Sequence, residues 1–599
     1  MNAEFASHHA ADRAGMRAIA VPCPTVSSLP LRRADFSTLV EGLDYAAAGD
    51  TGLTFYDRRA RPSLALSYRT LRESAVKSAR QLLASGLQPG DRVGIIATTD
   101  PAFIQAFFAC QYAGLVPAPL PLPLAFGNHR HYVIMLRRML DSVGAKAAFA
   151  SGPLEEFVRQ AALGTEARIV GSLDRLPAAR DDVALPRIAP TDLCYLQFSS
   201  GSTRSPVAVA NTHAAVIANA GAIIRHGLRI TDGDRAVSWL PLYHDMGLVG
   251  FVLVPMLCQV SVDLIATSDF AQRPLLWPRI LSDHGGTLSY SPSFGYELCT
   301  KRLATGASDS FDLRRWRVAG IGGDMIRRRV LEAFGDAFAT HGFDRRAFVA
   351  SYGLAEATLA VSFAALDQGI STEALDLDAL ERLGTAEAPH HAEARVRSFA
   401  VCGAPLPGHE VEIRDESGEP VPGRQVGRIY VRGPSVMREY WNQANETAAV
   451  LNGGWLDTGD LGFWADGRLV ITGRAKDLIV INGRNLLPQD LEWSAEQQMS
   501  LRSGDVAAFS VERDDNEEIV LLVQCRLADV PSREALRESV RAAIHARHGV
   551  NAEVVLVPAR SLPKTSSGKL SRSRARALYL AGELEEGRQT DSELQCAAP

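Results

Sequence analysis

The chain has 599 residues, of which 46% are hydrophobic and 22% charged, a balance typical of globular proteins, and its length exceeds what one hydrophobic core usually supports. The net charge of −5 argues against general binding to nucleic acid or to an anionic membrane. Eight cysteines without a CxxC pair give no zinc framework, and together with an N-terminus that lacks a secretory pattern they predict a cytoplasmic protein of at least two domains.

The first part of the chain alternates between helix and strand patterns. Residues 1–30 look weakly ordered, residues 61–87 predict a helix, and the apolar run at 92–98 predicts a buried strand. Asp100 then caps a helix that has Pro101 at its first position.

That helix should stop at Gly114. The apolar stretch at 102–126 is interrupted by glutamines and prolines, so it predicts a buried helix and a following loop rather than a membrane span. Farther on, residues 193–198 predict a strand and residues 214–228 a helix. This alternation predicts parallel α/β layers with a site at the carboxyl ends of the strands.

From Gly403 the pattern changes to short alternating strands, which predict a β-rich subdomain. We place an N-terminal domain of layered α/β subdomains plus this β-rich part at 31–473, and a small mobile α+β C-terminal domain at 474–599. A polar segment at about 367–395 lacks a strand pattern and is interpreted as an insertion. The strands expected after Gly403 lie at 409–415, 427–433, 467–474, 506–511, 518–527 and 553–557, and a helix is expected at 531–549.

A loop rich in hydroxyl groups follows the strand at 193–198. In FSSGST, residues 198–203, four hydroxyl side chains and a glycine fall together. Such a turn offers backbone N–H groups and hydroxyls to phosphate. It lacks the Gly-Lys-Ser/Thr ending of a Walker loop, so by itself it equally fits a plain polar turn.

Six further motifs follow this loop in order: WLPLYHDMGLVG, GIGGDM, SYGLAEAT, GWLDTGDLG, TGRAKDLIVINGRNLLPQDLE and LPKTSSGKL. Together with the loop, this series resembles the adenylate-forming enzymes, which include acyl-CoA synthetases, peptide-synthetase adenylation domains and luciferases. The resemblance spans about residues 60–575. It implies that a carboxylate attacks the α-phosphorus of ATP and expels pyrophosphate, a reaction that depends on positioning and on charge neutralisation.

The resemblance also implies residue roles. Lys569 would stabilise negative charge on the substrate carboxylate and the α-phosphate, Glu356 would hold Mg²⁺, and His244 would line the acyl site. Asp460, assisted by Arg474, would accept the ribose hydroxyls, while the loop would grip the phosphates and two glycine-containing motifs would sandwich the adenine. The residues expected to bind ATP or AMP are Ser199, Ser200, Gly201, Ser202, Thr203, Gly322, Gly323, Asp324, Ser351, Tyr352, Gly353, Asp460 and Arg474.

Each residue also has an ordinary structural interpretation. Tyr352 fits a core aromatic residue, and Glu356 and Asp460 fit helix-cap or turn acids. Lys569 fits a solvated base in a basic segment, and His244 fits a packed histidine. The ordered series of motifs favours the functional interpretation.

Departures from the commoner motifs resemble one branch, the fatty acyl-AMP ligases. Val207 and Ala208 stand where many relatives have lysine and glycine, and Arg204 is the nearest cation. The sequences SYGLAEAT, NGRNLLPQDLE and LYHDMGL and the insertion at 367–395 also match this branch. The resemblance implies that the triphosphate is held without the lysine, by loop amides, hydroxyls and Mg²⁺.

The insertion carries an implication about the second step. In the superfamily the small domain rotates after adenylation, and Lys476 falls at the hinge position. In the fatty acyl-AMP ligases a segment placed like 367–395 restrains this rotation, so that the acyl group passes to the phosphopantetheine thiol of an acyl carrier protein rather than to coenzyme A. About thirty residues follow Lys569, too few for a carrier domain, so the carrier is expected to be a separate protein. A passive surface loop is the alternative, although the segment is long for a connector.

We therefore expect an ATP- and Mg²⁺-dependent ligase that activates a medium- or long-chain fatty acid. The apolar segments 103–112 and 250–260 fit the lining of an acyl tunnel or ordinary core equally well. An AMP-forming fatty acyl-CoA synthetase is the alternative that the insertion disfavours. A non-catalytic adenylate-binding protein is disfavoured because the chain retains Glu356, Asp460, Arg474 and Lys569.

Overall fold

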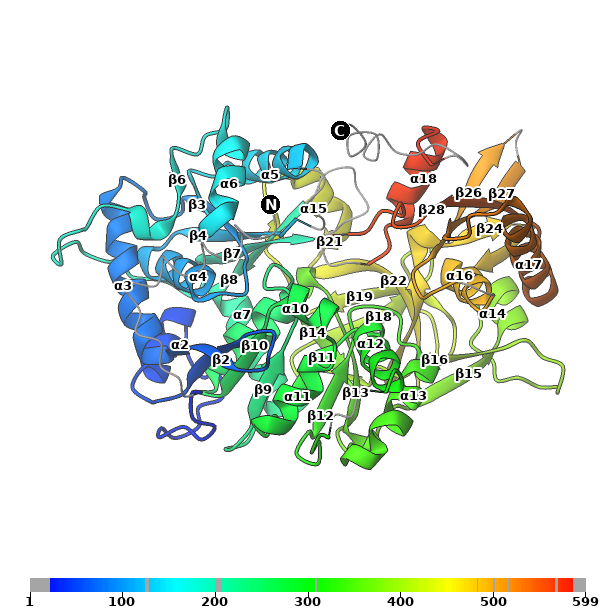
Figure 1. Ribbon diagram of the computed structural model, residues 1–599, viewed down its shortest axis with the longest axis horizontal. Coiled ribbons are helices and arrows are strands. Elements are labelled where there is room, and N and C mark those ends of the chain that lie inside the picture. Colours follow the sequence, from blue (N-terminus) through cyan, green and yellow to red (C-terminus); the bar gives the residue numbers. More distant parts are fainter. Residues whose placement is uncertain are drawn as a thin grey trace.

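The computed structural model describes residues 22–123, 129–199, 207–306, 310–481, 483–498, 501–513, 516–565 and 569–584. These residues form a mixed α/β fold with a large N-terminal and a smaller C-terminal part, as expected. In Figure 1 the early elements lie at the left and the last helices and strands at the upper right.

A nine-stranded sheet forms the centre of the large part. Its order is β17-β14-β13-β12-β11-β9-β10-β1-β2, and β1, β10, β9, β11, β12 and β13 run parallel while β2, β14 and β17 pair antiparallel at the two edges. The strands are β1 Gly52–Tyr56, β2 Pro62–Ser67, β9 Arg235–Ser238, β10 Ser261–Ile265, β11 Leu288–Ser291, β12 Val318–Ile321, β13 Phe348–Gly353, β14 Ala360–Phe363 and β17 Ala404–Pro405. The helices between them include α2 Leu39–Ala46, α7 His213–Ala222, α8 Asp245–Leu248, α9 Val254–Leu257, α10 Thr267–Gln272, α11 Leu276–Asp283, α12 Ser293–Ala304 and α13 Arg328–Phe338.

A second, parallel sheet has the order β4-β3-β5-β6 and lies at the left of Figure 1. The predicted helix cap is confirmed, because Asp100 accepts a hydrogen bond from the Phe103 N–H at 3.0 Å and Gly114 ends the helix at φ 67°. The elements are β3 Arg92–Ile96, α4 Pro101–Ala113, β4 Val116–Leu120, α5 His129–Val143, β5 Ala147–Phe149, α6 Glu155–Ala162 and β6 Ile169–Gly171.

Two expectations for this region were wrong. Residues 61–87 are not one helix, because Pro62–Ser67 pairs with β1 as strand β2 before helix α3 (Tyr68–Ala84) begins. The residues after Gly114 form strand β4 rather than a loop, and its prolines are tolerated because β4 lies at the edge of its sheet. In both cases pairing with another strand decided the local conformation.

A third sheet carries the strand that precedes the hydroxyl-rich loop. Its order is β20-β8-β7, with β7 Leu193–Ser199, β8 Val207–Thr212 and β20 Glu439–Tyr440. The helix expected at 214–228 is α-helical only to Ala222 and continues as a wider π turn, Ile223–Gly227. A second π turn occupies Val249–Leu253.

The β-rich part and the small C-terminal part follow as expected from the pattern. The β-rich sheet contains β18 Glu410–Arg414, β19 Gly427–Arg432, β21 Leu451–Asn452, β22 Trp455–Ala465 and β23 Arg468–Arg474, next to helix α15 Ala444–Val450. The C-terminal part contains β24 Ile479–Ile481, β25 Arg484–Leu486, α16 Pro488–Glu496, β26 Val506–Arg513, β27 Asn516–Cys525, α17 Val530–His548, β28 Ala552–Pro558 and α18 Arg572–Leu580. The residue at which one domain gives way to the next stays a prediction.

The segment at 367–395 contains regular structure, contrary to its polar pattern. Strand β15 (Thr372–Asp376) pairs antiparallel with β16 (Val396–Ala400), and helix α14 (Leu377–Leu383) follows β15 directly. Leu375, Leu377, Leu380 and Ala386 share a small apolar core with the β-rich part and with Leu487. The segment is therefore a packed unit and not an open loop.

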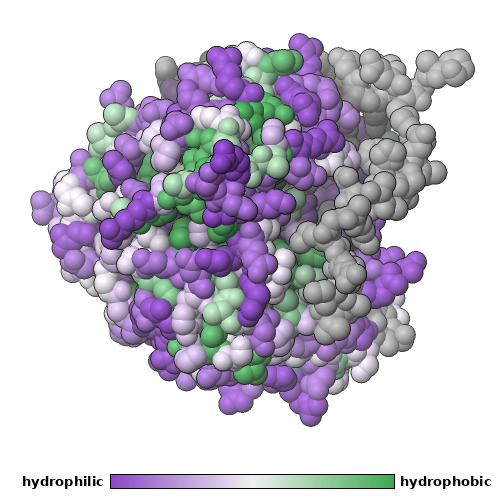
Figure 2. Space-filling view, turned by 90° about the vertical axis from the view of Figure 1, so that its left-hand side faces the viewer, coloured by the Kyte–Doolittle hydropathy of each residue, from purple (hydrophilic) through white to green (hydrophobic). Residues whose placement is uncertain are grey.

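None of the described helices combines the length and the apolar character needed to cross a bilayer. The face of the molecule shown in Figure 2 carries hydrophilic residues over most of its visible area, with hydrophobic residues in patches between them.

One buried histidine should make the fold sensitive to acid. His213 begins α7, is 2% exposed, and accepts a hydrogen bond through Nδ1 from the Leu39 N–H at 3.2 Å. Burial lowers the pKa of His213 to about 4, from about 6.5 in an unfolded chain. Between these two values the unfolded chain binds more protons, so stability is lost as the pH falls through this window.

We expect the free energy of unfolding to drop by about 2 kcal/mol between pH 7.5 and pH 5 through His213 alone. Chemical denaturation of the wild-type chain and of His213→Gln, which keeps a hydrogen-bond acceptor, checks this. The variant should lose that much less stability on acidification, and equal losses in both proteins would contradict the assignment.

Candidate active site

A single cavity of about 700 Å³ brings most of the expected site residues together. It opens at the carboxyl ends of β9, β12 and β13, where parallel strands leave backbone groups and loops free for a ligand. Residues of β22, β23 and the C-terminal part close it from the other side. Of the expected residues, the cavity is lined by Ser199, His244, Gly322, Gly323, Asp324, Ser351, Tyr352, Gly353, Glu356, Asp460, Arg474, Lys476 and Lys569.

Asp460 is a buried carboxylate of the cavity. It is 7% exposed, and its two oxygens are held separately: Oδ2 accepts from the Tyr352 hydroxyl at 2.8 Å and Oδ1 from Arg474 Nε at 3.0 Å. Burial, with Asp460 alongside, raises the pKa of Tyr352, so the phenol keeps its proton and donates. A carboxylate has lone pairs beyond these two bonds, so Asp460 can accept two further hydroxyl groups.

Glu356 is the carboxylate that was expected from the sequence to bind Mg²⁺. Its Oε1 accepts from the Tyr440 hydroxyl at 2.9 Å, and burial raises the pKa of Glu356. A desolvated carboxylate is stabilised by a hard cation, and Mg²⁺ typically uses one or two protein carboxylates together with substrate phosphates. The side chain therefore fits Mg²⁺, which would neutralise phosphate charge, and no cluster of three or more metal-binding side chains occurs in the described ranges.

Lys569 reaches the cavity from the C-terminal part. Its Nζ lies 3.8 Å from the point that a Cβ on Gly323 would occupy, and Gly323 has φ 78° in the turn after β12. The same cavity wall holds Asp245, whose Oδ1 lies 2.6 Å from His244 Nδ1. Burial alone would raise the pKa of Asp245, but His244 and Lys569 outweigh it and hold this pKa below its usual range. Lys569 and Asp245 thus place opposite charges on the same cavity wall.

The remaining nucleotide-binding candidates lie on two adjacent strand ends. A Cβ on Gly353 would stand 1.8 Å from the Leu359 carbonyl oxygen, so only glycine fits that close backbone contact. Ser351 donates weakly to the Ile321 carbonyl at 3.5 Å and ties the ends of β12 and β13 together. Asp324 is exposed and accepts from the Met325 N–H at 2.8 Å. These positions suit a flat ring held between the two turns, and that role stays a prediction.

The hydroxyl-rich loop is only partly described. Ser199 lies at the end of β7, with a buried Oγ that has no hydrogen-bond partner among the described residues. Ser200, Gly201, Ser202 and Thr203 lie outside the described residues, so their phosphate-binding role remains an expectation. Val207 and Ala208 begin β8, where both are buried and Ala208 packs in the core of the second sheet.

Lys476 occupies the short turn Ala475–Asp477 that follows β23. Burial, with Arg474 nearby, lowers the pKa of the Lys476 ammonium. Its neighbour Asp477 accepts from Arg572 Nη1 at 3.0 Å, and Arg572 also binds Glu492 at 2.7 Å. The turn is thereby tied to the C-terminal part, and the hinge role of Lys476 stays a prediction.

Asp245, Tyr440 and Arg572 are among the lining residues that were not expected from the sequence. Asp245 directly follows His244 and is a buried acid in a motif already noted, so its position could have suggested it. Tyr440 and Arg572 lie in stretches without a motif, and only the fold brings them to Glu356 and to the turn Ala475–Asp477.

Comparisons with known proteins place the chain in a family. The AMP-binding enzyme family matches residues 46–441. A Caulobacter vibrioides protein that is provisionally named an acyl-CoA synthetase is 51% identical over 572 residues, 95% of this chain and 99% of its own length. The medium-chain-fatty-acid–[acyl-carrier-protein] ligase JamA of Moorena producens is 32% identical over 585 residues, 93% of this chain and 97% of its own.

A structure from a study of fatty acyl-adenylate ligases of E. coli and L. pneumophila is 45% identical and superposes with a TM-score of 0.88, covering 92% of this chain and 99% of that one. Because the family match spans more than half of its residues, the chain belongs to the AMP-binding enzyme family, and it is an AMP-forming ligase of the fatty acyl-AMP ligase group.

Proposed function

We propose that this enzyme activates a fatty acid with ATP and Mg²⁺ and transfers the acyl group to the phosphopantetheine thiol of a separate acyl carrier protein, not to coenzyme A. In the first step a carboxylate oxygen forms a bond to the α-phosphorus while the bond to the β-phosphate breaks and pyrophosphate leaves. In the second, a thiol attacks the acyl carbonyl, loses its proton, and expels AMP. Lys569, Asp460 with Tyr352 and Arg474, and Glu356 are the residues that would position and neutralise the reacting groups.

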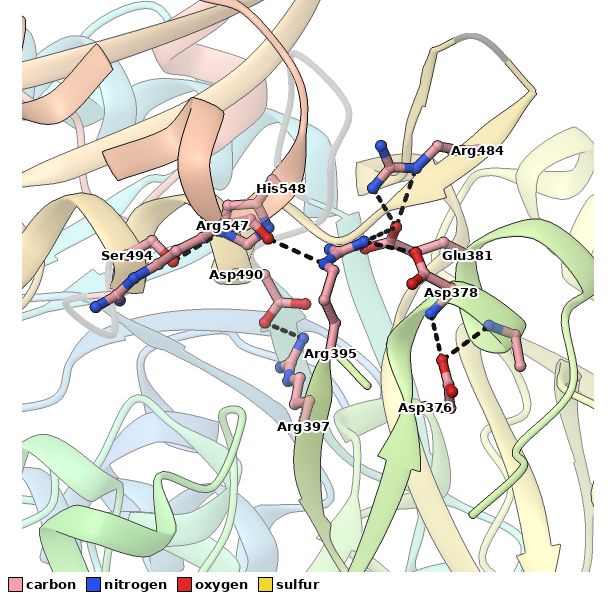
Figure 3. A network of polar contacts seen from close by, with 11 residues as sticks. Asp376, Asp378, Glu381, Arg395, Arg397, Arg484, Asp490, Ser494, Arg547 and His548 are labelled. Atoms are coloured by element: carbon pink, nitrogen blue, oxygen red, sulfur yellow. Dashed lines mark hydrogen bonds and ion pairs between the residues drawn. The ribbon is translucent and has the colours of Figure 1, made fainter. Parts of the chain in front are cut away.

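The observation that carries the choice of carrier protein over coenzyme A is a buried salt-bridge network between the insertion and the C-terminal part (Figure 3). Glu381, on α14, is 3% exposed. Its carboxylate accepts from Arg395 at 2.9 and 3.0 Å and from Arg484 at 2.5 and 3.1 Å. Arg484 belongs to β25 of the C-terminal part, so one acid joins the two parts of the molecule.

Further contacts strengthen this junction. Arg395 Nε donates to the carbonyl oxygen of Arg547, at the end of α17, at 2.9 Å. Arg397, on β16, forms an ion pair with Asp490 of α16, and both side chains are almost fully buried. Rotation of the C-terminal part would have to break these ion pairs and the hydrogen bond to the Arg547 carbonyl together. The network therefore supports a restraint on the second, thiol-accepting arrangement.

Product analysis tests the proposal. The purified enzyme is incubated with ATP, Mg²⁺ and fatty acids, with coenzyme A, with a phosphopantetheinylated carrier protein, or with neither, and acyl-AMP, acyl-CoA and acyl-carrier are separated. We expect acyl-AMP that persists in the presence of coenzyme A and is consumed by the carrier. Rapid conversion to acyl-CoA would make the enzyme an acyl-CoA synthetase, and absence of any adenylate would contradict the activity itself.

A further inference from the structure

The cavity continues past the polar groups as an apolar channel along the central sheet. Gly322 follows β12 at the carboxyl edge of the sheet, and Ile321 pairs with the last residue of β11. Leu288 and Ala236 also line the channel. They pair with each other near the amino ends of β11 and β9, away from the carboxyl edge of the sheet. The level of Gly322 and the level of the Leu288–Ala236 pair are four strand residues apart, about 13 Å. This depth suits an acyl chain of medium length.

Three consecutive residues lie between the far end of this channel and solvent. Leu228 and Ile230 line the cavity and are 8% and 2% exposed, whereas Arg229 between them is exposed. Arg229 has φ 46°, a backbone conformation that residues other than glycine rarely adopt. The preceding residues form a π turn, a feature that is frequent at functional sites. The unusual backbone turns both apolar side chains inward.

An ion pair between the half-buried Arg317 and the buried Asp234 fixes this segment. Arg317 donates through Nη1 to the Leu228 carbonyl at 3.0 Å and through Nη2 to the Arg229 carbonyl at 3.3 Å. The same guanidinium pairs with Asp234, 3% exposed, at 2.6 and 2.8 Å. Asp234 also accepts from the Thr231 N–H at 2.9 Å, so both ends of the segment are held by one pair of charges.

We propose that Leu228–Ile230 is the end wall of the acyl channel, that Ile230 sets the maximum length of the fatty acid, and that Arg317 is the positioning residue that holds this wall. The inference rests on the proposed function, because it assumes that a fatty acid is adenylated in this cavity. The preferred substrate is then an unbranched acid of medium length whose methyl end contacts Ile230. Longer acids would have to displace a segment that the Arg317–Asp234 ion pair holds in place.

The test measures kcat/KM for pyrophosphate release with straight-chain acids from butanoate to stearate. In the wild-type enzyme we expect kcat/KM to rise about fourfold per methylene up to a limit and then to fall. Ile230→Ala should move this limit by about two carbons toward longer acids, because it removes the side chain at the end of the channel. Ile230→Phe should move it toward shorter acids.

The matched control is Ile280→Ala, which truncates an equally buried isoleucine on α11 that does not line the cavity and should leave the chain-length profile unchanged. Arg317→Met should let longer acids be used, seen as a lower KM for long acids. If Arg317 has only a structural role, the variant should have a lower melting temperature and an unchanged profile of kcat/KM against chain length. If both Ile230 variants adenylate fatty acids with the wild-type profile, the end wall is wrongly assigned. If the wild-type enzyme adenylates no fatty acid, the proposed function fails and not this assignment.

Discussion

Replacing Lys569 with alanine is expected to lower the rate of acyl-AMP formation by about 10²–10³-fold, the usual effect of removing one preorganised donor to a developing charge. Three arginines of the described cavity wall are already paired: Arg474 with Asp460 at 3.0 Å, Arg428 with Asp457 at 2.7 Å and Arg572 with Glu492 at 2.7 Å. Lys569 lies instead beside the turn after β12. Its charge is thus available for the phosphate and the attacking carboxylate.

Initial rates of pyrophosphate release at saturating fatty acid check this expectation. The matched control is Lys564→Ala, which removes an exposed lysine of the same segment that does not line the cavity. It should retain near-wild-type rates. The KM for ATP should change much less than kcat in Lys569→Ala, because the interaction strengthens in the transition state. Near-normal adenylate formation by the Lys569 variant would remove this residue from the mechanism.

Much of the fold could be predicted where the signals are local. The helix expected at 531–549 is observed as Val530–His548, because its apolar periodicity, the Asp529 cap and Gly549 at its end all act within one segment. The strands at 427–433 and 467–474 were likewise identified by alternation. The strand at Pro62–Ser67 was missed because its conformation depends on pairing with β1, and the pattern of its own residues does not record that pairing.

The candidate site shows the same division between local and distant information. Asp460, Tyr352 and Lys569 were identified because each lies in a motif, although the hydrogen bond between Tyr352 and Asp460 joins residues 108 positions apart. Glu381 was not singled out, because a glutamate in a polar segment is usually solvated. Its burial depends on Arg484, 103 positions away, and no pattern in either segment predicts that pairing.

Replacing Glu381 with alanine is expected to raise the rate of acyl-CoA formation on the order of tenfold while acyl-AMP formation changes little. The substitution leaves Arg484, 12% exposed, without its carboxylate partner in the docked arrangement. Breaking a buried pair typically costs about 3–5 kcal/mol, and Arg395 offsets part of this because it keeps Asp378 at 2.9 Å. The C-terminal part should therefore separate from the insertion at 367–395 more often.

Single-turnover transfer from preformed acyl-AMP to coenzyme A measures this change directly. Glu393→Ala, an exposed acid of the same insertion, is the matched control and should behave as the wild-type enzyme. Arg484→Met breaks the same bridge from the other side, so the double variant should gain no more than either single variant. A gain in acyl-CoA would mean that the restraint, and not a missing coenzyme A site, sets the acceptor. Unchanged transfer in folded Glu381→Ala would place the discrimination elsewhere and leave the insertion a structural role only.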